Sequence, residues 1–277
     1  MVGKRRPRTP ARLALEIAGI YAVSGLAWVL APRDIVSPLV HGLTFALPSV
    51  LLVYLLVRRL LEELDQAHLA TEQAGVEAIE RLARVAEWKD DTLGGHNQRI
   101  ATYAFRLARE MGLSEAEADH LYHGALLHDI GKIGIPDEIL RKRTPLTADE
   151  TDLMRSHVQI GAQLLDGGSD PLLQTARRIA LTHHERWDGS GYPARLQGEA
   201  IPLAGRIVAV CDVFDALLSE RHYKAAWSLA ATTEYLRSRR GRDFDPAVVD
   251  ALLRCVPDLV PAKAETRHGH AMLTEAA

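Results

Sequence analysis

The segment HHERWDGSGYP, residues 183–193, places two adjacent histidines directly before a glycine-rich turn. The preceding residues, RIALT, are typical of an apolar helix that ends at the histidines. A second segment, ALLHDIGK at residues 125–132, has the same arrangement, with a His-Asp pair at the end of an apolar run and a glycine just beyond. Two apolar helices that end in ligand-type side chains predict one shared polar site inside a helical fold.

Three further segments supply the same residue types. His96 follows two glycines, His157 lies within MRSHVQIG, and Asp212 lies within VAVCDVFDAL. A single histidine on an apolar helix is commonly a core residue with a hydrogen-bond partner. Five separate segments are hard to explain in that way, because each polar group buried without a partner costs a few kcal/mol (about 2–7). Imidazole nitrogens and carboxylate oxygens are ligands for Fe, Mn, Zn or Ni, so the pattern predicts a metal centre.

The rest of the chain reads as helices joined by short loops, without a series of alternating strands. Ser114 with Glu117, and Thr147 with Glu150, have the spacing of capping boxes that begin helices. The expected fold class is therefore all-α.

Composition narrows the class of protein. The 277 residues include five basic residues before the first acidic one, and the remaining chain is acidic. An acidic body argues against binding of DNA or RNA, which requires basic surface. The two cysteines form no CxxC pair, so neither a disulfide framework nor a thiolate zinc site is expected, and a reducing compartment fits.

Two apolar runs near the N-terminus, residues 13–31 and 39–57, have the length of membrane-spanning helices. Basic residues lie before the first run and, at Arg58 and Arg59, just after the second. The positive-inside rule then predicts a transmembrane hairpin in the inner membrane with both termini in the cytoplasm. A cleaved signal peptide and a pair of buried core helices are the alternatives.

The sequence after this hairpin divides into a linker, a body and a tail. The predicted division is a basic tail at 1–12, the spans at 13–57, a helical linker at 58–83, a catalytic domain at 84–256 and a loosely ordered tail at 257–277. The linker has the composition of a helix and a partial heptad pattern. It is expected to form a parallel coiled coil in a homodimer or, alternatively, a single helix packed on its own domain.

The motifs together resemble one family. TLGGHNQRIATYA, HDIGKIGIPDEIL, MRSHVQIGAQLL, HHERWDGSGYP and RIVAVCDVFDALLSERHYK match the HD-GYP domain, a branch of the HD metal-dependent phosphohydrolases. The resemblance covers residues 84–256. It implies an all-helical HD-domain bundle and hydrolysis of cyclic di-GMP to pGpG, sometimes on to GMP. It also implies a cluster of two or three metals, most often iron or manganese.

The resemblance carries over ligands residue by residue. The implied metal ligands are His96, His128, Asp129, His157, His183, His184 and Asp212. Asp129 is expected to bridge two metals, with His96, His128 and Asp212 on one metal and the other three histidines on the second. Members with a third metal have an acidic residue where this chain has Thr92, so two metals are expected. Glu87 matches a common glutamate of the family and is interpreted as structural.

Five other residues are candidates for catalysis or substrate binding. Lys132 is expected to reach the phosphate or to orient the nucleophile, with a surface salt bridge as the alternative. Asp215, one helical turn after Asp212, is expected to position water or to support a ligand. Tyr192 is expected to hydrogen-bond phosphate or to stack on guanine. Arg221 and Lys224 match the basic, substrate-contacting positions of the family.

The predicted function is therefore a membrane-anchored phosphodiesterase for cyclic di-GMP in bacterial signalling. One alternative is hydrolysis of another nucleotide, such as a hybrid cyclic dinucleotide, a dNTP or ppGpp. Another is a non-catalytic module that binds partners, which loss of ligands would indicate, but every ligand is present. A diguanylate cyclase or a separate sensor is a candidate partner.

Overall fold

The structure is a computed structural model that describes residues 19, 22, 23, 26, 38–89, 95–167, 169–220, 225–257 and 259, with backbone alone at 38–45. The helices are α2 (Pro38–Lys89), α3 (His96–Glu110), α4 (Glu115–Leu126), α5 (Asp137–Leu140), α6 (Ala148–Arg155), α7 (His157–Leu164), α8 (Pro171–Thr182), α9 (Leu203–Leu218) and α10 (Leu229–Ser238). Two short 3-10 helices, η1 (Ile130–Gly134) and η2 (Gly198–Ala200), lie between them, and residues 246–257 are also helical. The described residues contain no strand, so the all-α prediction is confirmed.

The chain divides into two compact units, residues 1–74 and 75–277. In the first unit, large apolar side chains of α2 are exposed, including Leu47, Val50 and Val53. Among the residues that the structure describes, no helix has the length and apolar character needed to cross a membrane. The expected hairpin is therefore not supported here, and most of residues 13–31 lies outside the described residues.

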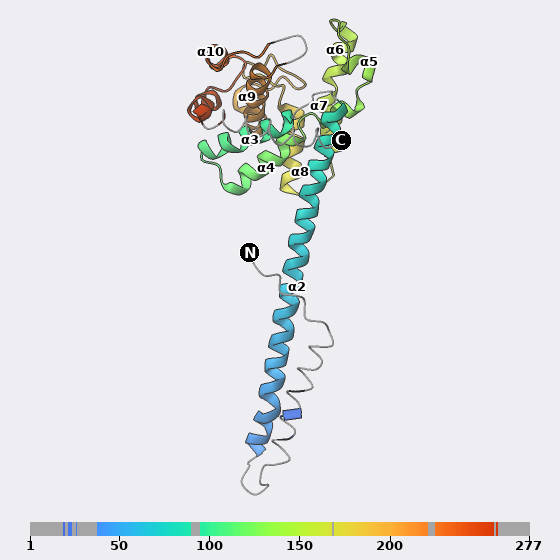
Figure 1. Ribbon diagram of the computed structural model, residues 1–277, viewed down its shortest axis with the longest axis vertical. Coiled ribbons are helices and arrows are strands. Elements are labelled where there is room, and N and C mark those ends of the chain that lie inside the picture. The colour runs from blue at the N-terminus through green and yellow to red at the C-terminus, as the bar shows by residue number, and fades with distance from the viewer. Residues whose placement is uncertain are drawn as a thin grey trace. The chain divides into compact units, whose positions relative to one another are not determined.

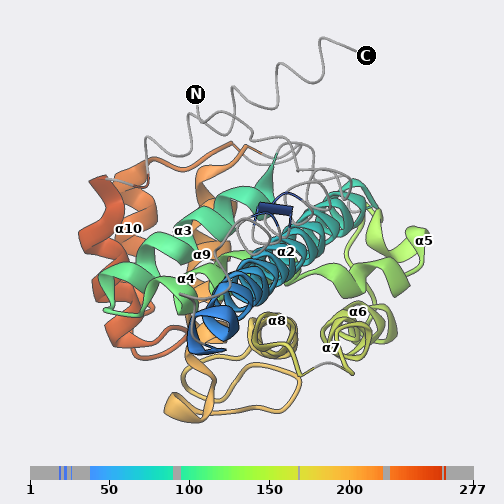
Figure 2. The ribbon, with the colours of Figure 1, turned by 90° about the horizontal axis from the view of Figure 1, so that it is seen from below.

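The second unit is a helical bundle with α8 in its middle. α8 contacts α4, α7 and α9, and α3 packs on both α4 and α9. Figures 1 and 2 show α3, α9 and α10 on one side of α8, and α5, α6 and α7 on the other. A segment at the end of α8 is thus within reach of helices from both sides of the bundle.

The hydrophobic core of this unit holds α3, α8 and α9 against one another. Fully buried residues include Ile100 and Leu107 of α3, Ile179 of α8, and Ile207 and Phe214 of α9. Each large apolar side chain buried in this way stabilises the fold by about 1.5–3 kcal/mol. The core therefore fixes the spacing of α3, α8 and α9, the three helices that carry or adjoin His96, His183 and Asp212.

Both predicted capping boxes are present. The side chain of Ser114 accepts a hydrogen bond from the backbone N–H of Glu117, whose carboxylate accepts one from the backbone N–H of Ser114 at 2.9 Å. Thr147 and Glu150 form the same reciprocal pair at the start of α6. These caps fix the first turns of α4 and α6. His128 and Asp129 follow the end of α4, and His157 follows the end of α6.

The predicted linker is part of one continuous helix, α2, which extends to Lys89. Leu61, Leu64, Leu82 and Val85, on the proposed coiled-coil seam, are exposed. Ala83 and Ala86 are buried in the core of the second unit. The last turns of α2 therefore pack on the domain, and the coiled coil remains a prediction.

The end of α2 also holds the segment that follows the His-Asp pair. The Nζ of Lys89 donates to the carbonyl of Ile133 at 2.9 Å and lies 3.4 Å from a carboxylate oxygen of Asp137. Arg141 donates in turn to the carbonyl of Lys89 at 3.3 Å. These contacts fix η1, which begins directly after Asp129.

Gly131 lies where η1 approaches α7 too closely for a side chain. A Cβ at this position would be 1.9 Å from the carbonyl oxygen of His157 and 2.5 Å from the backbone nitrogen of Gly161. Backbone atoms cannot rotate away, so we expect Gly131→Ala to lower the free energy of unfolding by about 3 kcal/mol, at the upper end for overpacking. A urea titration of the metal-free chain measures this.

Gly75→Ala is the matched control, because a Cβ at Gly75 meets nothing within 4 Å and the residue is helical. Gly75→Ala is expected to leave the free energy of unfolding unchanged or to raise it by up to about 1 kcal/mol, because alanine favours the helix more than glycine does. The urea midpoint should stay the same or rise accordingly. Equal midpoints for the two variants would show that the close approach of η1 and α7 is not a constraint on the fold.

Candidate metal centre

Three histidines direct the same ring nitrogen into one buried space. Their Nδ1–H groups donate to carbonyls of their own chain segments, since a carbonyl oxygen can only accept: His128 to Ala125 at 2.8 Å, His157 to Met154 at 2.8 Å and His183 to Ile179 at 3.0 Å. The three Nε2 atoms are buried and have no hydrogen-bond partner. A neutral imidazole protonated at Nδ1 has its free lone pair on Nε2, which is the state that binds a metal.

Asp129 lies between these histidines, in the turn that joins α4 to η1. Its Oδ2 is 3.2 Å from Nε2 of His128, and its Oδ1 is 3.3 Å from Nε2 of His157 and 3.6 Å from Nε2 of His183. Oδ1 is buried without a hydrogen-bond partner. One carboxylate oxygen therefore faces each side of the cluster, as a bridging ligand requires.

His96 begins α3 and is held by the two aspartates of α9. Its Nδ1–H donates to Oδ2 of Asp215 at 2.7 Å, and its Nε2 is 3.3 Å from Oδ1 of Asp212. A carboxylate that accepts from the outer nitrogen of a ligand histidine fixes the orientation of the ring. Asp215 thus orients His96, and Asp212 lies beside it at the cluster.

The ligand-type atoms form two groups. One group is Asp129, His157, His183 and His184, and the other is His96, His128 and Asp212. Within each group the atoms lie within 4.8 Å of one another. Several buried, unpartnered nitrogens and a carboxylate oxygen that converge in this way fit divalent metals with N and O ligands. The structure therefore brings together all seven predicted ligands in the predicted grouping, and their metal-binding role remains a prediction.

Charges around the cluster keep its carboxylates ionised. Burial alone would raise the pKa of Asp129, but Lys132 and His128 hold it well below its usual value. Burial likewise opposes protonation of His96, but Asp212 and Asp215 outweigh it and raise the pKa of His96 to about 9. His96 must therefore release a proton when it becomes a metal ligand.

The pKa values of the adjacent histidines, His183 and His184, are lowered, whereas that of His96 is raised. Burial lowers the pKa of His183, and burial together with the neighbouring His183 lowers the pKa of His184 well below its usual value. Both rings are neutral at pH 7 as a result. Neutral imidazoles and ionised carboxylates are the protonation states that metal binding needs.

Comparison with known proteins agrees with this geometry. Residues 80–248 match the family model described as HD domain. The chain belongs to the HD domain family. The matched residues contain all seven ligand-type residues of the cluster.

Three curated relatives of this HD domain protein are named as phosphodiesterases. The chain is 49% identical over 199 residues, 72% of its length and 52% of the relative, to the cyclic di-GMP phosphodiesterase response regulator RpfG of Xanthomonas campestris. It is 45% identical over 188 residues, 68% of its length and 36% of the relative, to 3'3'-cGAMP-specific phosphodiesterase 2 of Vibrio cholerae. It is 44% identical over 178 residues, 64% of its length and 48% of the relative, to a cyclic di-GMP phosphodiesterase of Thermotoga maritima. The chain thus spans about half the length of these relatives, or less.

Lys132 forms an ion pair with Asp129 of the cluster. Its Nζ is 2.7 Å from Oδ2 of Asp129, and the side chain is largely buried. The surface salt bridge that was the alternative interpretation does not describe this position. Lys132 lies in η1, one turn after the aspartate, so the HD pair and the lysine are positioned by one segment.

The turn after the two histidines is held by Glu185 of the HD domain. The buried carboxylate of Glu185 accepts hydrogen bonds from the backbone N–H groups of Ala194, at 2.8 Å, and Leu196, at 3.1 Å. Gly191 allows the chain in this turn to fold on itself, because a Cβ there would be 2.3 Å from the backbone nitrogen of Arg186.

Tyr192 lies against the cluster. Its ring stacks on that of His184, with centroids 4.9 Å apart and an interplanar angle of 26°. Burial and the nearby Asp129 raise the pKa of Tyr192 to about 12, with Arg155 and Lys132 opposing. The hydroxyl is therefore neutral and able to donate. Both expected roles of Tyr192, a hydrogen bond to phosphate and stacking on guanine, remain predictions.

Arg99 is a residue of the site that the sequence reasoning missed. Its guanidinium, on α3, donates twice to Asp215, from Nε to Oδ1 at 2.7 Å and from Nη2 to Oδ2 at 2.9 Å. Asp215 is completely buried. The three-residue spacing from His96 places Arg99 on the same helix face, and that spacing is the signal that could have found it. Arg221, Lys224 and Thr92 lie outside the described residues.

Removing Arg99 is expected to destabilise the chain strongly. Arg99→Ala leaves the carboxylate of Asp215 buried and less completely paired, so we expect a loss of about 3 kcal/mol in the free energy of unfolding. Urea titration of the metal-free protein measures it.

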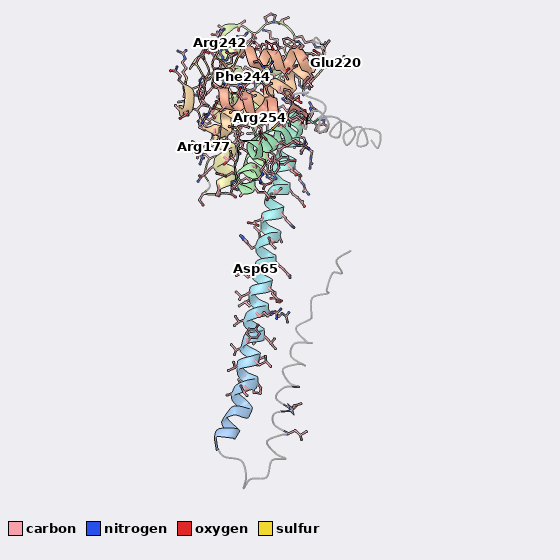
Figure 3. The ribbon with its side chains drawn as sticks, turned by 90° about the vertical axis from the view of Figure 1, so that its left-hand side faces the viewer. Asp65, Arg177, Glu220, Arg242, Phe244 and Arg254 are labelled. Carbon is pink, nitrogen blue, oxygen red and sulfur yellow. The ribbon has the colours of Figure 1, made fainter. Side chains whose placement is uncertain are left out.

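Arg254→Ala is the control, because Arg254, labelled in Figure 3, forms an exposed pair with Glu110 at 2.6 Å. An exposed ion pair is screened by solvent, so its loss should change the urea midpoint far less. Similar losses in the two variants would contradict the role assigned to the Arg99–Asp215 pair.

Proposed function

We propose that this HD domain protein belongs to the HD-GYP branch and hydrolyses cyclic di-GMP to pGpG. The observation that carries the proposal is the pair of ligand groups on either side of Asp129. Two of the three relatives described above, at 49% and 44% identity, are named for cyclic di-GMP, which supports the choice of substrate.

Two divalent metals, of iron or manganese, fit the nitrogen and oxygen ligands of the cluster. When bound, a metal pair neutralises charge on a phosphodiester and lowers the pKa of water. The chain's own groups supply the rest. Asp129 lies against both groups, with one carboxylate oxygen 3.2 Å from Nε2 of His128 and the other 3.3 Å from Nε2 of His157. Lys132 places a positive charge beside Asp129, and Asp215 accepts the Nδ1–H of His96 and so orients that ring.

Substrate contacts are proposed on two sides of the cluster. Tyr192 offers a neutral hydroxyl beside Asp129. Arg221 and Lys224 are proposed as contacts on sequence alone. They follow Glu220, the last described residue of this segment, which is labelled in Figure 3.

A second substrate, 3'3'-cGAMP, is favoured by one observation. The relative at 45% identity is named as specific for that hybrid cyclic dinucleotide. Both substrates have two phosphodiester bonds and differ in one base. The ligand-type residues serve either substrate, so base recognition decides between them.

The test is a direct comparison of substrates. The purified chain, loaded anaerobically with Fe(II) or with Mn(II), is incubated separately with cyclic di-GMP and 3'3'-cGAMP, and the products are resolved by chromatography. The proposal expects kcat/KM for cyclic di-GMP to exceed that for 3'3'-cGAMP by about tenfold or more. The reverse preference would replace the proposed substrate by the hybrid dinucleotide. A fully loaded chain that cleaves neither would favour a non-catalytic binding module.

We further propose that residues 13–57 anchor the chain in the inner membrane as a multi-pass protein, with the HD domain in the cytoplasm. The support is the apolar sequence of 13–31 and 39–57, its basic flanks, and the exposed apolar side chains of α2. Homodimer formation through the linker helix, and a diguanylate cyclase or sensor as partner, are proposed with it. An alkaline phosphatase reporter fused at residue 34 should be active and one fused after residue 57 inactive, and the reverse result would overturn the topology.

A further inference from the structure

Arg155 occupies a fixed position at the edge of the metal centre. It is the last residue of α6, and His157 begins α7 two residues later. The carbonyl of Met154, the residue before Arg155, accepts the Nδ1–H of His157 at 2.8 Å. The backbone on both sides of Arg155 is thus tied to the orientation of a ligand-type histidine.

The side chain of Arg155 lies over the ring of Tyr192. The guanidinium carbon is 5.1 Å from the ring centroid, within the range of a cation–π contact. Because the same ring stacks on His184, three groups from α6, the turn and the end of α8 are in contact. This contact fixes the direction of an otherwise flexible side chain.

The ion pair that Arg155 forms among the described residues is long and exposed. Among the described residues, the carboxylate within 4 Å of the Arg155 guanidinium is that of Asp152, at 3.7 Å. Both side chains are more than half exposed, so solvent screens this pair. Lys132 differs, because its Nζ is 2.7 Å from Asp129. A guanidinium is planar and can bind two phosphate oxygens at once, so Arg155 offers a ready site for an anion.

A cyclic dinucleotide has two phosphates, and in the proposed function the ligand-type residues around Asp129 would hold metals that bind the reacting one. We propose that Arg155 binds the second, non-reacting phosphate of the cyclic dinucleotide, with Tyr192 holding the guanidinium in place. The inference rests on the proposed function for its substrate class. It assigns Arg155 to substrate binding and leaves the reacting bond to the groups around Asp129.

The test compares a substrate that has a second phosphate with one that lacks it. Arg155→Ala is expected to raise KM for cyclic di-GMP by about 10- to 100-fold, with kcat changed less than about twofold. With bis(p-nitrophenyl) phosphate, which has a single phosphodiester, kcat/KM is expected to stay within about twofold of wild type. Metal content and thermal midpoint are measured on the same preparations and are expected to be unchanged.

Two further variants separate charge from position. Arg155→Lys keeps the charge without the planar fork and is expected to have an intermediate KM. Arg143→Ala removes an exposed arginine from the loop ahead of α6 and should have the wild-type KM. If Arg155→Ala and Arg143→Ala give the same KM, the inference is wrong. If Arg155→Ala impairs both substrates equally and loses metal, Arg155 supports His157 and does not bind phosphate.

The outcome that overturns the proposed substrate differs from the outcome that overturns the role of Arg155. If the wild-type chain cleaves 3'3'-cGAMP but not cyclic di-GMP, the proposed substrate is wrong, and the Arg155 comparison is made with 3'3'-cGAMP, which has the same two phosphates. If the wild-type chain cleaves no cyclic dinucleotide, both proposals are overturned. If the wild-type chain cleaves cyclic di-GMP and the Arg155→Ala variant has the same KM for it, this inference alone is overturned.

Discussion

Asp129→Ala is expected to lower kcat/KM for cyclic di-GMP by at least about 10³-fold, equivalent to about 4 kcal/mol of transition-state stabilisation. One carboxylate oxygen of Asp129 faces His128 of one ligand group, and the other faces His157 of the second group. Loss of an outer hydrogen-bond partner of a ligand typically costs 10- to 100-fold in metal affinity or activity, and loss of a shared ligand should cost more. Metal content, measured by elemental analysis, should fall from about two toward zero or one per chain.

Asp65→Ala removes an exposed acid of α2, labelled in Figure 3, and serves as the control with wild-type metal and activity. Asp129→Asn keeps the side-chain shape and is expected to lose activity nearly as severely, because it removes the charge. An Asp129→Ala chain that folds and retains both full metal content and full activity would contradict the bridging role.

Lys132→Met is expected to lower kcat for cyclic di-GMP by about 10²–10³-fold while metal content stays at the wild-type value. The Nζ of Lys132 is 2.7 Å from Asp129, so in the proposed function its charge would lie beside the reacting phosphate. Loss of one such preorganised group typically costs this factor in kcat. Methionine retains most of the length and apolar stem of lysine, which limits the effect on packing. Steady-state kinetics with parallel metal analysis measure both quantities.

Lys142→Met is the matched control, because Lys142 also pairs with a carboxylate, that of Glu150, at 2.5 Å. It should leave kcat unchanged. If Lys132→Met lowered metal content as strongly as activity, the role of Lys132 would be to hold Asp129 for metal binding, and a direct role at the phosphate would be wrong.

Much of the site could be predicted because its signals are local in sequence. His128 and Asp129 are adjacent, as are His183 and His184, and each pair ends an apolar helix. The capping boxes at Ser114 and Thr147 likewise depend on residues three apart. Local patterns of this kind fix where helices begin and end, and the structure brings these ligand-type residues together.

Other features depend on contacts that sequence spacing does not encode. Asp215 was predicted as a support, but its pairing with Arg99 joins residues 116 positions apart. Arg155 gave no signal, because its contact with Tyr192 requires the turn after α8 to fold against the end of α6. The close approach at Gly191 is to the chain's own backbone, which composition alone does not distinguish from an approach to substrate.

The proposed metal-dependent phosphodiesterase activity is tested by hydrolysis of cyclic di-GMP by the full chain as a function of bound metal. Metal-free protein is titrated anaerobically with Fe(II) or Mn(II), and initial rate and metal content are measured at each point. We expect no turnover without metal and a maximal rate at about two metals per chain, with pGpG as the first product. Full turnover in metal-free protein, or no turnover of cyclic di-GMP at two metals per chain, would contradict it.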